Sequence, residues 1–368
     1  MRYRLGWRQV PGTLYRLGVD TVRFAVIIVA PRPPLLGALM ISAVARTRPS
    51  VAAAAAAAVF ALAISGCTSA DKKGSETQAA DTAFTKIGET ANLEVPESVR
   101  YDADLDAFFV SNIKGAPSAK DNNGYIARVD PTKPDSFTVV VRGGQGGVTL
   151  NAPKGIAIQG DTLWVSDIDV LRGFDKRTGA SVATISFAGR NPRFLNDVAV
   201  GPDGSIYITD SSMQMTGSGP PRYFGQDKLF VVKGRDVSVI LEGQAKLAQP
   251  NGVTWDIKGD RLLLAPIGGQ SITSITATNL QPIPIAGGMG GYDGIEVLPD
   301  GRIIVSSWQD STINVVVDGA LRKVITNVDA PADIGVDTKR MVLAIPRFSA
   351  GRVEYYHIPP APATSTPR

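Results

Sequence analysis

One short pattern returns along residues 84–358, and it limits the available folds more than any other feature of this chain. Each copy has a polar residue, then a small residue, then Ile or Val, as in Lys154-Gly155-Ile156 and Asn251-Gly252-Val253. The polar positions, called anchors below, are Glu97, Lys154, Asn196, Asn251, Asp293 and, more loosely, Asp333. The intervals between them are 57, 42, 55, 42 and 40 residues, which is typical of one supersecondary unit repeated around a fold.

Each anchor is followed by further short segments rich in β-branched and aromatic residues, such as TLWVSD at 162–167 and SIYITD at 205–210. Six units of four antiparallel strands predict an all-β, six-bladed β-propeller over residues 84–358. The sixth unit lacks its outer strand, and the segment FTKIGE at 84–89 is expected to supply it and close the ring. No long helical periodicity follows residue 67, and an irregular β-sandwich would not explain why the anchor returns six times.

In a propeller the first strand of each blade lines the central channel, so the anchors are expected to converge near the axis. Three carboxylates, one ammonium and two amides sum to a charge of −2. Converging oxygens with that charge suit a hard divalent cation. The alternative for Asn196, Asn251 or Asp293 is a turn-initiating role, which is common for Asn and Asp, but Glu97 has no such role.

The chain has one Cys and one His, which excludes sites that need several of either. Zinc sites of Cys and His ligands, iron–sulfur clusters, intrachain disulfides and 2-His metal triads are ruled out. His357 lies among Tyr355 and Tyr356 on the last strand segment and is interpreted as a packing residue, so no Ser-His-Asp triad is expected. Any metal would have to be held by oxygen.

On these residues the chain resembles the senescence marker protein, gluconolactonase and regucalcin group of six-bladed propellers, over roughly residues 90–357. The resemblance implies one divalent cation held by Glu97, Asn251 and Asp293, with Ca²⁺ expected and Mg²⁺, Mn²⁺ or Zn²⁺ as alternatives. It implies hydrolysis of a lactone or related ester, with Asp293 as both ligand and general base. It also implies that Asn196 contacts the substrate or a metal-bound water, and we place Lys154 and Asp333 with it as substrate-binding residues.

Two departures from the family pattern leave a second function open. An Arg usually stands two residues before the substrate-binding Asn, whereas here Phe194 holds that position and the side chain of Arg193 should point to the other face. Lys154 could bind an anionic substrate, pair with Glu97 or Asp333, or take the place of the metal. The alternative function is therefore a non-catalytic propeller that binds a ligand or a protein, with a structural metal or none.

The glycine-rich segments and one long insertion lead to two further predictions about loops. The glycine-rich segments at 143–147 and 287–291 do not join a strand to a helix, so they are interpreted as loops between blades and not as nucleotide sites. The segment at 211–225, SSMQMTGSGPPRYFG, is the longest insertion within a blade. We expect it to be a lid or specificity loop, because long loops on rigid scaffolds often carry function.

Residues 1–66 are predicted to be a signal region that precedes a lipidated Cys67. The apolar run at 51–64 is too short to span a bilayer and has the length of a signal-peptide core. It ends in Ile64-Ser65-Gly66-Cys67, the pattern cleaved before a lipid-modified Cys in bacterial lipoproteins. The true start is expected at Met40, and the alternative is a membrane-associated element at 24–30. Export by the general secretory route to the bacterial cell envelope follows.

Charge and composition complete the domain plan. Residues 1–66 hold eight Arg and one acid, so the overall charge of +4 leaves −3 for the remaining chain, which removes the argument for a nucleic-acid partner. Residues 67–83 are expected to be a flexible polar tether after the lipid, and residues 359–368 a Pro-rich tail. The expected partners are a small-molecule substrate and the membrane through Cys67, with the propeller acting as a monomer.

Overall fold

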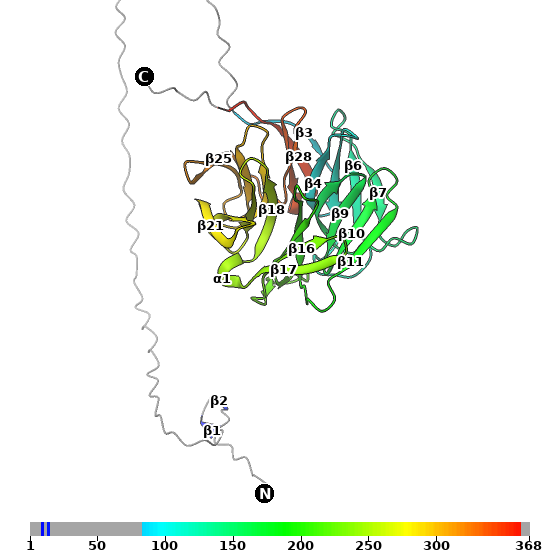
Figure 1. Ribbon diagram of the computed structural model, residues 1–368. Coiled ribbons are helices and arrows are strands. Elements are labelled where there is room, and N and C mark those ends of the chain that lie inside the picture. The colour runs from blue at the N-terminus through cyan, green and yellow to red at the C-terminus, as the bar shows by residue number, and fades with distance from the viewer. Residues whose placement is uncertain (1–8, 11–12, 15–82, 362–368) are drawn as a thin grey trace, which may run out of the picture. The chain divides into compact units, whose positions relative to one another are not determined.

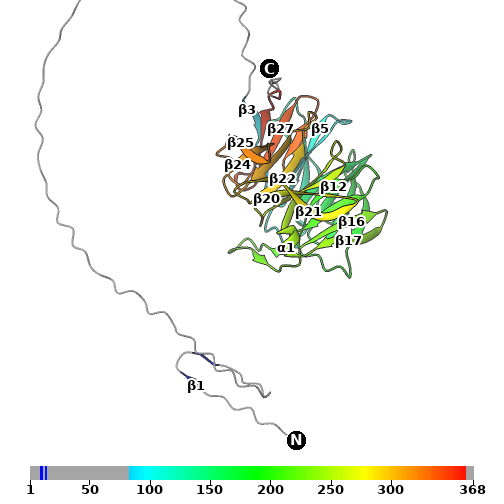
Figure 2. The same ribbon diagram turned by 60° about the vertical axis from the view of Figure 1, so that its left-hand side comes forward.

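The computed structural model describes residues 9–10, 13–14 and 83–361, and Cys67, nearly all of the predicted signal region and nearly all of the tether lie outside the described residues. The described residues near the N-terminus form the paired strands β1 (Gln9–Val10) and β2 (Thr13–Leu14). Residues 83–361 form four four-stranded sheets and one eight-stranded sheet that joins two further blades. These six blades of four antiparallel strands are arranged around a centre, which confirms the prediction of an all-β, six-bladed propeller (Figures 1 and 2).

The blades follow one another in chain order. Blade 1 consists of β4 (Pro96–Asp102), β5 (Ala107–Asn112), β6 (Tyr125–Val129) and β7 (Thr138–Arg142). Blade 2 consists of β8 (Pro153–Gln159), β9 (Thr162–Asp167), β10 (Val170–Asp175) and β11 (Ser181–Ser186). Blade 3 consists of β12 (Leu195–Val200), β13 (Ile206–Asp210), β16 (Lys228–Lys233) and β17 (Asp236–Glu242).

The second half of the ring repeats this arrangement. Blade 4 consists of β18 (Pro250–Asp256), β19 (Arg261–Pro266), β20 (Ser271–Thr276) and β21 (Asn279–Gly287). Blade 5 consists of β22 (Tyr292–Val297), β23 (Ile303–Ser307), β24 (Thr312–Val317) and β25 (Ala320–Thr326). Blade 6 consists of β26 (Gly335–Asp337), β27 (Val342–Arg347), β28 (Arg352–His357) and β3 (Thr85–Thr90). One parallel pair, Gly287 with Ala320, also joins the outer strands of blades 4 and 5.

The ring closes as the sequence predicts, because β3 from the start of the propeller pairs antiparallel with β28 from its end. Glu354 of β28 ties the two ends together. Its carboxylate accepts hydrogen bonds from Lys86 of β3 at 3.0 Å and from Arg347 of β27 at 2.8 Å. A fourth strand from the start of the propeller therefore covers the edge of β28 and completes blade 6.

The hydrophobic cores lie between neighbouring blades. One cluster joins Phe109 and Ile126 of blade 1 to Ile156 and Leu163 of blade 2, and all four side chains are fully buried. Such packing gives each sheet a buried partner on both faces. In the described residues the helices are short, namely α1 (Gln244–Leu247) and the 3₁₀ turn η1 (Phe348–Ala350). None of them is long and apolar enough to cross a membrane.

The Gly that follows the anchor in blades 2, 4 and 5 is explained by the close approach of inner strands. A Cβ on Gly252 would lie 2.0 Å from the carbonyl oxygen of Asp293 in the next blade, and one on Gly155 would lie 2.5 Å from Cα of Asp197. Only a residue without a side chain fits such a contact without displacing backbone. The Gly of the repeat is therefore a packing requirement of the channel wall.

Candidate metal and substrate site

The structure brings five of the predicted site residues to one cavity of about 220 Å³. The five belong to the inner strands of five consecutive blades and are nearly or fully buried: Glu97, Lys154, Asn196, Asn251 and Asp293. Because each is the second residue of its inner strand, the sequence repeat becomes a ring of polar side chains at one end of the channel. We call these five residues the anchor ring.

Side chains on neighbouring strands hold the anchor strands in place. At the end of β9, Asp167 accepts hydrogen bonds from the backbone N–H groups of Asn151 and Ala152, just before Lys154. At the end of β13, Asp210 accepts a hydrogen bond from the backbone N–H group of Phe194, just before Asn196. These carboxylates were not among the predicted site residues, although each ends a TLWVSD-type segment and its recurrence was visible in the sequence.

Hydroxyl groups on the second strands join adjacent blades at the anchors themselves. Thr209 of β13 donates to the carbonyl oxygen of Asn251 at 2.6 Å, and Ser166 of β9 donates to the carbonyl oxygen of Asn196. In blade 5, Ser306 donates to the carbonyl oxygen of Ala332 at 2.9 Å. The anchor positions are thus bound from the preceding blade, which fixes the spacing of the ring.

The two carboxylates of the anchor ring each have an oxygen without a hydrogen-bond partner. Glu97 Oε2 and Asp293 Oδ1 are buried and unsatisfied, whereas Asp293 Oδ2 accepts a hydrogen bond from Trp308 Nε1 at 2.8 Å. Burial raises the pKa of both groups well above its ordinary value, and the neighbouring carboxylates raise it further. An uncompensated buried carboxylate is costly, so this pair favours a cation between them.

Lys154 is fully buried beside the anchor carboxylates but does not form a close ion pair. Its ammonium donates to the carbonyl oxygen of Ala152 at 3.0 Å and lies 4.2 Å from the centre of the Phe194 ring. None of the ion pairs found in residues 83–361 includes it. Burial lowers the pKa of Lys154 to about 8, although the charge of Glu97 acts in the opposite direction. Direct pairing with Glu97 or Asp333 is therefore absent from this part of the chain.

The departure from the family pattern at residues 193 and 194 has a structural counterpart. Phe194 lines the cavity, while the guanidinium of Arg193 stacks on the Phe224 ring at 4.2 Å and is not part of the lining. The prediction that Arg193 points to the other face agrees with this placement. The amide of Asn196 remains in the cavity, where its Nδ2 donates to Ser211 Oγ at 3.0 Å.

The placement of Asp333 at the sixth anchor position is wrong by one residue. β26 pairs Gly335 with Ala344, and this register makes Ile334 the counterpart of Val99 and Ala332 the counterpart of Glu97. Ala332 also accepts the second-strand hydroxyl through its carbonyl oxygen, as Asn251 does. A shift of one residue along a strand turns a side chain to the opposite face, and Asp333 is not part of the cavity lining. The anchor ring therefore carries two carboxylates and one ammonium, a charge of −1.

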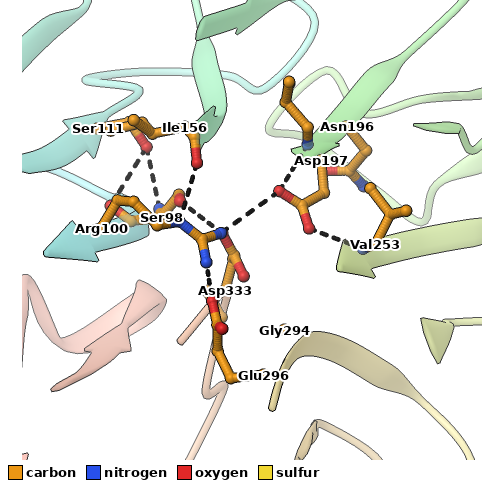
Figure 3. A network of polar contacts seen from close by, with 12 residues as sticks. Ser98, Arg100, Ser111, Ile156, Asn196, Asp197, Val253, Gly294, Glu296 and Asp333 are labelled. Atoms are coloured by element: carbon orange, nitrogen blue, oxygen red, sulfur yellow. Dashed lines mark hydrogen bonds and ion pairs between the residues drawn. The ribbon is translucent and has the colours of Figure 1, made fainter. Parts of the chain in front are cut away.

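Asp333 instead belongs to a second ionic layer around Arg100 (Figure 3). Its Oδ2 accepts hydrogen bonds from Ser98 and, at 3.1 Å, from Arg100 Nη2. Arg100 also contacts Glu296, lies 3.8 Å from Asp197 Oδ1, and donates from Nε to the carbonyl oxygen of Ile156 at 2.9 Å. Three carboxylates surround one guanidinium, so this layer adds negative charge beside the anchor ring and supports a cation there.

The anchor ring offers oxygen donors, which are the ligands that a hard cation prefers. Glu97 and Asp293 contribute free carboxylate oxygens, and Asn251, which contacts Asp293 through its amide, contributes a carbonyl oxygen. In residues 83–361 no cluster of three or more His, Cys, Asp or Glu side chains has the arrangement of a metal site. Because Asn251 is not one of these residue types, the donor set Glu97, Asn251 and Asp293 contains only two of them and is not expected to form such a cluster.

The predicted insertion lies at the cavity. It forms the hairpin of β14 (Met213–Gln214) and β15 (Arg222–Tyr223), and its lining residues are Met213, Met215, Pro221 and Tyr223. A loop of blade 1 meets it: Ser118 N donates to the carbonyl oxygen of Met215 at 3.1 Å, and Met215 N donates to Ser118 Oγ at 2.9 Å. The blade 1 loop was not among the predicted features, and the sequence holds no periodic signal for it.

Comparison with known proteins agrees with this architecture. Residues 95–336 match a family model described as SMP-30/Gluconolactonase/LRE-like region. A luciferin-regenerating enzyme matches with a TM-score of 0.55 and 15% identity over 75% of this chain and 95% of its own. A protein assigned as a gluconolactonase matches with a TM-score of 0.56 and 15% identity over 76% of this chain and 92% of its own. A search of curated proteins finds no match.

Proposed function

Because this chain belongs to the SMP-30/gluconolactonase/LRE-like family, we propose that it is a metal-dependent hydrolase of lactones or related esters. The observation that carries the proposal is the pair of buried, unpartnered carboxylate oxygens on Glu97 and Asp293 at the base of a cavity. Glu97, Asn251 and Asp293 would hold the divalent cation, and Ca²⁺ is the ion their oxygens suit best. When bound, such an ion supplies Lewis-acid chemistry at the substrate carbonyl and lowers the pKa of water.

The residues around this position then have separate tasks. The Asp293 carboxylate accepts the proton of the attacking water, while Trp308 holds its Oδ2 in place. The water oxygen bonds to the carbonyl carbon, the ring C–O bond breaks, and the alkoxide oxygen takes up the proton. The Lys154 ammonium stabilises the negative charge that develops on the carbonyl oxygen, and Asn196 positions the substrate.

A metal titration and a substrate panel test this proposal together. We expect the purified protein to contain or take up close to one divalent cation, measured by elemental analysis and calorimetry. The wild type should hydrolyse lactones or aryl esters, and Asp293→Asn should lower kcat by at least about 100-fold. Asp236→Asn, at an exposed carboxylate on β17, is the matched control and should keep wild-type activity. Less than a tenth of an equivalent of metal, or equal rates for Asp293→Asn and wild type, would refute the proposal.

One observation favours a non-catalytic binding propeller as the second candidate. The sixth anchor is Ala332, and Lys154 brings an ammonium into the ring, so the site has fewer carboxylates than the repeat suggested. In this alternative the cavity binds a ligand, and any cation only neutralises Glu97 and Asp293. Saturable ligand binding without turnover, by wild type and Asp293→Asn alike, would support it.

We also propose that Cys67 carries a lipid and that the propeller works at the outer side of a bacterial membrane. The basis is the Ile64-Ser65-Gly66-Cys67 sequence after a 14-residue apolar run. Cys67→Ser is expected to leave the protein in the soluble fraction after cell fractionation, and metabolic labelling with a fatty acid should mark only the wild type. Membrane retention of Cys67→Ser would contradict lipidation.

A further inference from the structure

The wall of the cavity differs sharply from its base. Apart from the anchor ring, every lining side chain is apolar or aromatic. Ile113 and Phe348 come from blades 1 and 6, Ile267 follows β19, and Phe194 replaces the polar group that the family pattern places before Asn196. The base therefore supplies polar chemistry to the reacting group, while the rest of any bound molecule contacts hydrocarbon.

The wall offers few hydrogen-bond partners for a hydroxylated substrate. The indole N–H of Trp308 already donates to Asp293, which leaves the Tyr223 hydroxyl as the only other polar group on a wall side chain in this part of the chain. A sugar lactone carries several hydroxyl groups, and each one buried without a partner costs free energy. The cavity thus selects against polyhydroxylated rings.

The apolar wall is completed by two loops that hold each other in place. The blade 3 hairpin places Met213, Met215 and Tyr223 at the cavity, and blade 1 places Pro117 there. The reciprocal Ser118–Met215 hydrogen bonds join the loops, and Gly217 lies so close to Ala116 that a Cβ on it would be 3.2 Å away. These contacts order the two loops, which we call the lid, against each other. Tyr223 is partly exposed where the lid borders solvent.

We infer that the substrate is a lactone or ester with an apolar alkyl or aryl substituent, and that the paired lid loops select it through Met215 and Tyr223. This inference rests on the proposed function for the reaction, but the apolar selection is a binding property of its own. A cavity of about 220 Å³ is smaller than the usual range for drug-sized ligands, so the substituent is short.

Lactams have the shape of lactones but resist hydrolysis. Their affinities therefore measure the selection of the substituent separately from the reaction. The probes are δ-valerolactam, its 6-alkyl homologues with one to six carbons, and the polyhydroxylated gluconolactam, with affinities measured by calorimetry on the purified protein. We expect Kd to fall about threefold to fourfold for each added methylene until the cavity is full. Gluconolactam should bind at least 100-fold more weakly than the best alkyl lactam. Equal or tighter binding of gluconolactam would overturn the inference.

Variants of the lid assign the selection to its residues. Met215→Ser and Tyr223→Ser should each flatten the dependence of Kd on chain length, with a loss of about tenfold for the longest lactam. Ile283→Ser is the control, because it removes a half-exposed apolar side chain from β21 outside the cavity and should leave the series unchanged. Circular dichroism confirms folding of each variant. A chain-length dependence that persists unchanged in both lid variants would refute the role of the lid.

The same experiment distinguishes the two proposals. If alkyl lactams bind with the expected chain-length dependence but no lactone or ester is hydrolysed, the proposed reaction fails and the apolar selection stands. If alkyl lactones are hydrolysed but gluconolactone is hydrolysed with a higher kcat/KM, the reaction stands and the selection is refuted.

Discussion

Replacement of Glu354 by Gln tests the closure of the propeller, because this carboxylate joins the first and last strands of the ring. Its side chain is 3% exposed and lies 2.8 Å from Arg347, 2.9 Å from Arg352 and 3.0 Å from Lys86. Burial alone would raise the pKa of Glu354, but the hydrogen bonds from Lys86 and Arg347 outweigh it and lower the pKa from 4.5 to about 2.

The shift converts into a stability that depends on pH. At about 1.4 kcal/mol per pKa unit, the full shift corresponds to about 3 kcal/mol. Lys86 and Arg352 are more than a third exposed, and solvent screens their contribution, so we expect about 2 kcal/mol. Because the folded-state pKa is lowered, the stabilisation is complete above pH 4.5 and is lost as the pH falls toward 2.

Urea denaturation followed by tryptophan fluorescence measures this difference. At pH 7 Glu354→Gln should unfold with a free energy about 2 kcal/mol below that of wild type, and the gap should narrow steadily between pH 4.5 and 3. Glu89→Gln is the matched control, since Glu89 lies on β3 and contacts Lys86 but is 40% exposed, and it should change stability by less than about 0.5 kcal/mol. A gap that stays constant with pH, or no gap at pH 7, would refute the assigned role of the ion pairs.

Three further predictions concern the channel. Trp308→Phe removes the hydrogen bond that orients Asp293 and should weaken divalent metal binding by about 10-fold to 100-fold in calorimetry; unchanged affinity would exclude the orienting role. Gly252→Ala places a Cβ against the next blade and should lower the free energy of unfolding by about 1–3 kcal/mol, whereas a neutral result would show that the inner strands separate easily. Burial lowers the pKa of Lys154, so its charged form costs free energy in the folded state, and Lys154→Met should raise the free energy of unfolding by about 1–3 kcal/mol at pH 7. Because the folded pKa of Lys154 is about 8 and the unfolded one is higher, wild-type stability should rise with pH above 8 and the gap should close; a less stable variant would show that the ammonium is needed for folding.

The repeat was readable from sequence because packing imposes it on every blade. An anchor followed by Gly, as at Gly155, Gly252 and Gly294, reflects the close approach of neighbouring inner strands, and this requirement recurs in three of the six blades. The alternating apolar residues of the strands follow from the cores between blades. Strand number, ring closure by residues 85–90 and the grouping of five anchors at one cavity were all predictable for this reason.

Register and loop pairing were not predictable in the same way. The sixth copy of the pattern is loose, and only the pairing of Gly335 with Ala344 shows that Ala332 holds the anchor position. The Arg100 layer joins residues from four blades, and the Ser118–Met215 contact joins loops about 100 residues apart. Asp197 and Asp333 each follow an anchor position and Arg100 and Glu296 each stand three residues after one, but these positions carry different residue types in different blades, so the repeat does not show which of them pair. No repeat relates Ser118 to Met215.

By itself, the sequence determined the class of fold and the channel position of Glu97, Lys154, Asn196, Asn251 and Asp293. It also determined that any bound metal would need oxygen ligands, since a chain with one Cys and one His has few others. Only the tertiary structure decided which carboxylate oxygens lack hydrogen-bond partners and where Lys154 places its charge. It also decided that apolar side chains of two loops line the same cavity as the anchor ring. The reason is physical. Burial between blades constrains every blade in the same way, so it produces a repeat in the sequence. The contacts of the site occur only once in the molecule, between side chains that come together only when the ring closes.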